Sequence, residues 1–182
     1  MKKILKYIIF WISIIVLLIT SSCQAEVVSH TSQKLERYAV STNDLPDGWA
    51  FFSEDWSGEL GEDYYAATYG IPNKDIIGLS QVIAMYPSEE QTQLGYSERE
   101  EKWFSVGEVW PGTEFTPLNS NDKYRYECVQ IFSDIVDCTF LQGHNNIVVL
   151  ILVSIDGKTM TMAQFNEILR VLDERLNIVA LE

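Results

Sequence analysis

The sequence predicts a single α+β domain, in which helices pack on the faces of an antiparallel β-sheet. Its expected elements come in the order strands, helix, three closely spaced strands and helix, which is typical of that class. The three later strands are separated only by short turns and therefore predict a meander. No period of 20–50 residues indicates a repeat architecture.

The first group of expected strands covers residues 49–52, 64–69 and 80–86. The third is the clearest, because Val82, Ala84 and Tyr86 alternate with Ile83 and Met85. Strong turn chemistry in residues 43–48 precedes the first strand. Residues 34–41 predict a short helix or strand.

Two capping boxes predict the starts of two helices. Ser88 to Gln91 opens a surface helix that ends near residue 104, and Thr161 to Gln164 opens the last helix. The last helix places one apolar stripe toward the sheet, made of Met162, Phe165, Leu169, Leu172 and Leu176.

The meander is expected at residues 123–131, 135–141 and 147–154, with turns at 133–134 and 143–146. Every residue from 147 to 153 is apolar. Such a run is typical of a strand in the middle of a sheet that is covered on both faces.

Two cysteines of the domain, Cys128 and Cys138, are predicted to form a disulfide. If residues 131 and 135 pair across the hairpin, residue 128 pairs with 138. Cross-strand Cβ atoms lie about 4.5–5.5 Å apart, slightly more than a disulfide prefers, and local twist closes the gap. Tyr126, Val136 and Phe140 then share their face. The alternative is a pair of free thiols.

Residues 1–23 predict an export signal. Lys2, Lys3 and Lys6 precede a thirteen-residue apolar stretch from Tyr7 to Ile19, which is short for a membrane span. The end of the segment resembles the lipobox of bacterial lipoproteins, which implies lipidation of Cys23. Thr20 departs from that pattern, because an aliphatic residue is usual there.

Other fates of the segment stay open: cleavage by signal peptidase I after Ala25 or after Ser22, or retention as an uncleaved anchor. All of them place the domain outside the cytoplasm. Residues 24–33 are expected to be a tether and residues 34–182 the single domain.

The chain of 182 residues carries 13 basic and 26 acidic residues, a formal net charge of −13. Without the three signal lysines the exported part is near −16. This charge opposes binding to nucleic acid and anionic lipid, and favours cations or a basic partner. A solvated acidic surface is the plainer interpretation.

Catalytic motifs do not stand out. His30 lies in the tether, and His144 lies in a hairpin turn, where a solvent-exposed side chain is expected. No nucleophile elbow, zinc motif or phosphate loop is present in the sequence, and two cysteines without nearby histidines do not make a zinc site. We expect no catalytic residue, cofactor or metal.

An acidic loop offers a weak calcium site. Its carboxylates are Asp55, Glu59, Glu62 and Asp63, but Gly58 is out of register with an EF-hand loop. A plain acidic loop is the alternative.

Aromatic residues are dense between residues 49 and 69. Most are expected in the core, whereas Trp56 and Trp110 lie in loops and are the two candidates for a binding surface.

The turn from Asp44 to Trp49, the strand–helix unit around Pro87 and the terminal meander–helix resemble small bacterial envelope lipoproteins. Some of these have a fold similar to the Mog1/PsbP group, an antiparallel sheet between helices, whose members mostly bind partners or serve as accessory subunits. The resemblance covers most of the domain by layout, and only Leu-Pro-x-Gly-Trp matches locally.

We therefore expect a non-enzymatic envelope lipoprotein, held to the membrane through its N-terminal lipid, that binds a protein partner or a ligand. A secreted form is the alternative location. A small extracytoplasmic hydrolase using carboxylates, and a calcium-dependent adhesive or sensor domain, are the alternative functions.

Overall fold

A computed structural model describes residues 34–55, 63–74, 77–104 and 115–179. The chain divides into two units, Met1–Lys34 and Leu35–Glu182, and the second is the folded domain. Among the described residues, no helix is both long and apolar enough to cross a membrane.

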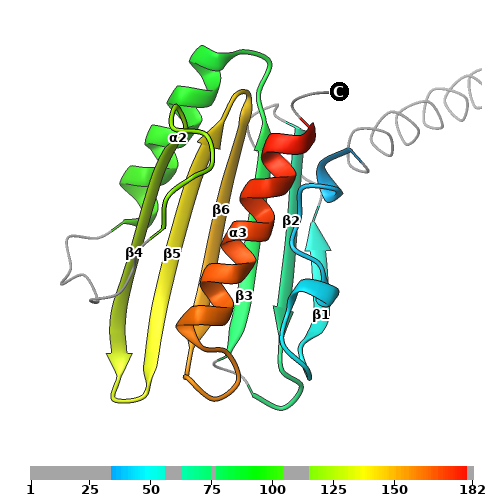
Figure 1. Cartoon of the computed structure of the whole chain (residues 1–182), viewed down its shortest axis with the longest axis vertical. Coiled ribbons are helices and arrows are strands. Elements are labelled where there is room, and N and C mark those ends of the chain that lie inside the picture. Colours follow the sequence, from blue (N-terminus) through cyan, green and yellow to red (C-terminus); the bar gives the residue numbers. More distant parts are fainter. Residues whose placement is uncertain (1–33, 56–62, 75–76, 105–114, 180–182) are drawn as a thin grey trace, which may run out of the picture. The chain divides into compact units, whose positions relative to one another are not determined.

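The domain is built on one six-stranded antiparallel sheet in the order β1-β2-β3-β6-β5-β4 (Figure 1). Its strands are β1 (Ala50–Asp55), β2 (Asp63–Gly70), β3 (Gly78–Met85), β4 (Lys123–Phe132), β5 (Ile135–His144) and β6 (Ile147–Ile155). The predicted α+β class is confirmed. The apolar strand β6 lies between β3 and β5, as its composition predicts.

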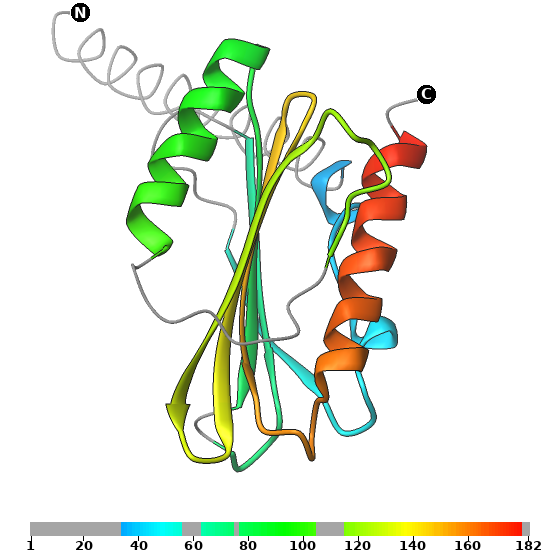
Figure 2. The same ribbon diagram turned by 60° about the vertical axis from the view of Figure 1, so that its left-hand side comes forward.

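Helix α3 (Met162–Val179) packs on one face of the sheet and α2 (Glu89–Trp103) on the other (Figure 2). The larger core lies under α3, where Phe165, Leu169 and Leu172 meet Phe140 and Ile151, all of them fully buried. A smaller core under α2 contains Tyr86, Tyr96, Phe104, Leu141 and Leu150. Since each strand alternates its side chains between faces, both cores use the same strands.

Both helices begin at the predicted capping residues. The Ser88 hydroxyl accepts a hydrogen bond from the Gln91 N–H at 3.3 Å. The Thr161 N–H donates to the Gln164 side chain at 2.9 Å, while the Gln164 N–H donates to the Thr161 hydroxyl at 3.2 Å. These bonds satisfy backbone groups that have no partner within a helix.

The segment before β1 is fastened to α3, since Arg175 of this helix donates to the Ala39 carbonyl and to the Asp44 carboxylate. Residues 34–36 are helical, and a single 3₁₀ turn, η1 (Thr42–Asp44), follows. In the Leu-Pro-x-Gly-Trp turn, the Trp49 N–H donates to the Pro46 carbonyl at 3.3 Å and Gly48 has a φ of 89°, which favours glycine. The Trp49 indole donates to the Thr159 carbonyl at 3.2 Å. This motif is therefore a structural anchor.

Cys128 and Cys138 form the predicted disulfide between directly opposed residues of β4 and β5, with a Cα–Cα distance of 4.0 Å. Tyr126 and Phe140 share their buried face, and Val136 packs against it. The predicted pairing of 131 with 135 is wrong by one residue. The register shifts between Gln130 and Phe132, and Phe132 pairs with Ile135.

Candidate binding face of the sheet

Helix α2 covers only part of its face, and the described residues leave an open area beside it. One row of paired residues crosses this area from β2 to β5: Thr68 pairs with Ser80, Ser80 with Leu152, and Leu152 with Thr139. These four side chains are half-buried. In the same area Gly70 pairs with Gly78. Because the side chains in these neighbouring rows are small, they leave a depression in this face of the sheet.

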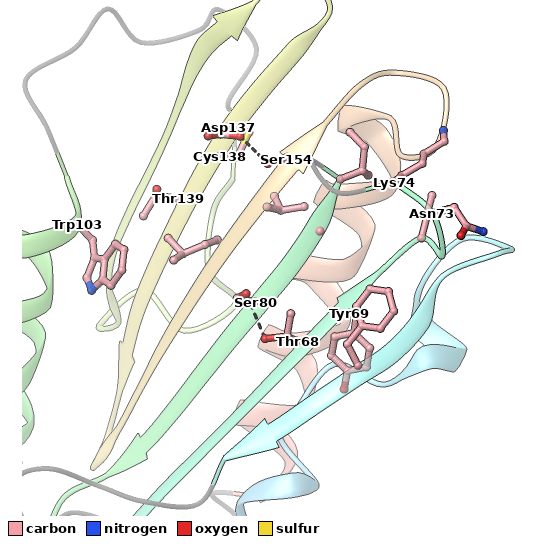
Figure 3. A pocket seen from close by; sticks show the side chains of 16 residues that line it. Thr68, Tyr69, Asn73, Lys74, Ser80, Trp103, Asp137, Cys138, Thr139 and Ser154 are labelled. Atoms are coloured by element: carbon pink, nitrogen blue, oxygen red, sulfur yellow. Dashed lines mark hydrogen bonds between the residues drawn. The ribbon is translucent and has the colours of Figure 1, made fainter.

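This depression is a cleft of about 550 Å³, which we call the open-face cleft (Figure 3). Trp103, at the end of α2, lies on one side of the cleft (Figure 3). Phe52 of β1 also lines the cleft, and its ring lies against Gly70. The exposed fractions of Trp103 and Phe52 are 41% and 55%. A Cβ at Gly70 would lie 2.4 Å from a ring carbon of Phe52, so this glycine allows the ring to rest on the strand. The volume is in the range of small-molecule pockets, and the open shape also suits a protein segment.

The cleft floor offers hydroxyl groups more than charges. The Ser154 hydroxyl donates to the Asp137 carboxylate at 2.6 Å, and the hydroxyls of Thr68 and Ser80 are 3.4 Å apart (Figure 3). Lys74, also at the cleft, lies 3.9 Å from the Asp156 carboxylate. The floor can therefore exchange hydrogen bonds with a partner without a strong charge of either sign.

The chemistry of Asp156 is that of a structural turn. Partial burial acts to raise its pKa, but hydrogen bonds from the backbone N–H groups of Thr159 and Lys158, from the Thr159 hydroxyl, and the nearby Lys74 together lower it to about 2. A carboxylate with so low a pKa stays ionised and is a poor general acid at neutral pH.

Within the described ranges, no group of three or more His, Cys, Asp or Glu residues is arranged to hold a metal ion. Two of the calcium candidates, Glu59 and Glu62, lie outside the described residues, as does the side chain of Asp55. Asp63 begins β2 and is exposed. The weak calcium prediction is therefore neither supported nor contradicted.

Other candidates from the sequence also lie outside the described residues. They are the lipidation site Cys23, the tether histidine His30 and the loop residues Trp56 and Trp110. The binding role of the two tryptophans stays a prediction, and the structure adds Phe52 and Trp103 as exposed aromatics on described elements.

His144 is the clearest correction, because its side chain is only 3% exposed. Strand β5 continues through His144, so the turn begins at Asn145, two residues later than predicted. Its Nδ1 lies 2.9 Å from the Asp122 carboxylate, and its Nε2 lies 2.8 Å from the Asn145 amide nitrogen. A donor amide of Asn145 at Nε2 assigns the ring proton to Nδ1, which faces Asp122, and neither nitrogen contacts a nucleophile among the described residues.

The His144 contacts belong to a buried polar network under the C-terminal half of α3. The Gln142 amide nitrogen donates to Asp122 at 2.9 Å and to Asp173 at 2.6 Å, and the Leu118 N–H donates to Asp173 at 2.6 Å. Gln142 Oε1 is buried and has no hydrogen-bond partner among the described residues. A buried carbonyl without a hydrogen-bond partner lowers the free energy of unfolding, so this network stabilises the domain less than a fully paired one would.

Sequence reasoning missed the open-face cleft and this network for the same reason. Thr68 and Ser80 are neighbours through the pairing of β2 with β3, but Thr139 joins their row only because β3 pairs with β6, which is not evident in the linear pattern. The available signal was one small polar residue in each of two expected strands, Thr68 and Ser80. For the network, Asp122, Gln142 and Asp173 are too far apart in the chain for any local pattern.

Comparison of the sequence with protein-family models finds no match, and comparison with curated proteins finds none either. What can be proposed for the domain therefore depends on its own residues.

Proposed function

We propose that this chain is an exported protein, anchored to the membrane through a lipid on Cys23, whose α+β domain binds a protein partner through the open-face cleft. The observation that carries the proposal is the open part of the sheet, with hydroxyl groups on its floor and two exposed aromatic side chains, Phe52 and Trp103, beside it.

Export is supported by the signal-like residues 1–23 and by the disulfide. Disulfides persist mainly in oxidising compartments, and Cys128 and Cys138 are 0% and 1% exposed in the larger core. The resemblance of the end of the segment to the lipobox of envelope lipoproteins agrees with this location.

A protein partner is supported by the character of the open face. Large exposed aromatics are favoured at the energetic centres of protein interfaces. Hydroxyl groups beside them can pair with backbone groups of a partner, and an open, shallow area accepts a flat surface better than an enclosed pocket does. The acidic charge of the domain favours a partner with a basic surface.

The anchor is tested by mass spectrometry of the mature N-terminus, purified from the envelope fraction. A diacylated Cys23 is the expected result. An unmodified N-terminus at Cys23 or at Glu26 would show cleavage by signal peptidase I and would remove the anchor from the proposal.

The binding face is tested by replacing its two aromatics in the full chain, as Phe52→Ala with Trp103→Ala. The matched control is Leu94→Ala with Leu118→Ala, since both leucines are also strongly exposed, at 61% and 63%, but lie away from the cleft. Proteins that co-purify with the detergent-solubilised chain are quantified by mass spectrometry. We expect one partner to fall at least tenfold with the cleft variant and to stay with the control. Equal recovery from both variants would argue against this face.

A further inference from the structure

A second cleft, of about 520 Å³, lies at the other end of the α2 face and shares no lining residue with the open-face cleft. Its walls come from the first turns of α2, the turn between β5 and β6, and the residues just before β4. We call it the polar cleft.

Amide side chains dominate the lining of the polar cleft. They belong to Gln93, Asn119, Asn121, Asn145 and Asn146. An amide offers a donor and an acceptor side by side, as does a hydroxyl group. This lining therefore matches a ligand rich in hydroxyl groups better than it matches an apolar one.

An aromatic ring completes the cleft. Tyr96 reaches it from α2, and a Cβ at Gly143 would lie 3.2 Å from the Tyr96 ring, so glycine lets the ring approach the strand. Burial raises the pKa of Tyr96 to about 12, although Arg125 acts to lower it, and the hydroxyl keeps its proton at neutral pH. Because the Tyr96 side chain is only 5% exposed and belongs to the smaller core, it supports the base of the cleft, and the amides are the groups that a ligand meets.

The charges around the cleft disfavour an anion. Glu89 and Asp122 are carboxylates and Lys123 is the cation in its lining. Asp122 already accepts hydrogen bonds from Gln142 and His144. A phosphate or carboxylate ligand would meet this lining on a domain that is itself strongly acidic.

The buried network fixes one wall of the cleft. Asn145 has a φ of 51°, an uncommon conformation for a residue other than glycine. Its amide nitrogen is used by His144, which is held in turn by Asp122. Since the amide nitrogen of Asn145 is bonded to His144, its Oδ1 is the atom that can accept a hydrogen bond from a ligand. Its orientation is set before binding, which reduces the entropy lost on association.

We propose that the polar cleft binds a neutral saccharide, with its hydroxyl groups on the amide side chains of the lining. Asn145 is the positioning acceptor of this site. The proposal does not depend on the partner-binding role of the open-face cleft.

Isothermal titration calorimetry of the full chain in detergent tests the proposal, with chitotetraose, cellotetraose and maltotetraose as the probes. We expect at least one of them to bind, and Asn145→Gly to weaken its affinity at least tenfold. The matched control is Asn73→Gly, because Asn73 is the other described non-glycine residue with positive φ, at 68°, and it lies at the open-face cleft. Glycine suits both backbones, so both variants should fold.

Asn73→Gly and Phe52→Ala with Trp103→Ala are expected to bind the saccharide as the parent chain does. Gln93→Ala, on the exposed side of the cleft, gives a second variant that should weaken binding. No heat with any probe at millimolar concentration overturns the proposal. Binding that is unchanged in both Asn145→Gly and Gln93→Ala overturns the proposal as well. Loss of binding in the variant Phe52→Ala with Trp103→Ala also overturns it, because the saccharide would then bind at the open-face cleft.

Discussion

Gln81 shows how one side chain can hold an irregular segment against a sheet. It is fully buried on β3, where its Oε1 accepts from the Val40 N–H and its Nε2 donates to the Val40 carbonyl, both at 2.8 Å. The Tyr69 hydroxyl also donates to this carbonyl, at 2.6 Å. The backbone N–H and carbonyl of Val40, which lie outside the sheet, thereby receive the hydrogen bonds that a neighbouring strand would otherwise supply.

Gln81→Ala should destabilise the domain by about 2–3 kcal/mol, since it leaves the buried Val40 N–H without its partner and creates a cavity. Urea denaturation followed by tryptophan fluorescence measures the change. Ser80→Ala is the control, because Ser80 precedes it on the same strand but faces the open side, and we expect it to cost under about 1 kcal/mol. An equal loss of unfolding free energy in both variants would show that the Gln81 amide does not hold the segment.

Asp156 predicts a pH dependence of stability. Its pKa is about 2 in the folded state and about 3.9 in the unfolded chain. A lowered folded pKa contributes stability above the unfolded value, and the contribution is lost as pH falls from about 4 toward 2. We expect Asp156→Asn to be less stable by about 2 kcal/mol at pH 6 and nearly equal to the parent at pH 2. Urea denaturation at a series of pH values checks this, and a difference that stays constant with pH would contradict it.

His144 marks the limit of prediction at the residue scale. Its place near a turn in the sequence is the usual signal for exposure, yet the ring is buried by contacts from Asp122 and the end of β5. Asp122 comes from the segment before β4, which no local pattern brings to this turn. By contrast, the pairing of Cys128 with Cys138 is predicted correctly, because both residues belong to one hairpin and the bulge between Gln130 and Phe132 leaves their pairing unchanged.

At the scale of elements, the hairpin of β4 and β5 is constrained by a covalent cross-link. Strand β4 is an edge of the sheet and is fixed to β5 by the disulfide as well as by its ladder. The bulge between Gln130 and Phe132 places exposed Ile131 and Phe132 at the tip without disturbing the cysteine pair.

Reducing the disulfide should lower the free energy of unfolding by about 2.5–3 kcal/mol, because the bridge closes a loop of roughly ten residues in the unfolded chain. Chemical denaturation with and without dithiothreitol measures this. The double variant Cys128→Ala with Cys138→Ala is the control and should not respond to the reductant. A parent protein that is equally stable in both conditions would contradict the assigned role.

Element existence was easier to predict than element position. The helix starts predicted at Ser88 and Thr161 and the central strand predicted from the apolar run in β6 rest on local signals, and each is confirmed. The bulge in β4 and the extension of β5 to His144 are not visible locally, since both depend on how neighbouring strands meet.

At the scale of the whole domain, the two faces of the sheet differ in what covers them. The α3 face carries the larger core, closed by α3 and the segment of residues 34–49, while α2 leaves part of the other face open (Figure 2). The sequence predicts helices on the faces of a sheet but not this imbalance, which follows from the strand order. The proposed binding surface is a consequence of that order.

In-cell photo-cross-linking at Phe52 tests the central claim most directly. The full chain is expressed in the producing cell with Phe52→p-benzoylphenylalanine, which keeps an aromatic ring at the cleft, or with the same replacement at Leu94 as the control. We predict one discrete protein adduct from position 52 that weakens strongly with Trp103→Ala, and no such adduct from position 94. No adduct from position 52, or the same adduct from both positions, would contradict a binding function for this face.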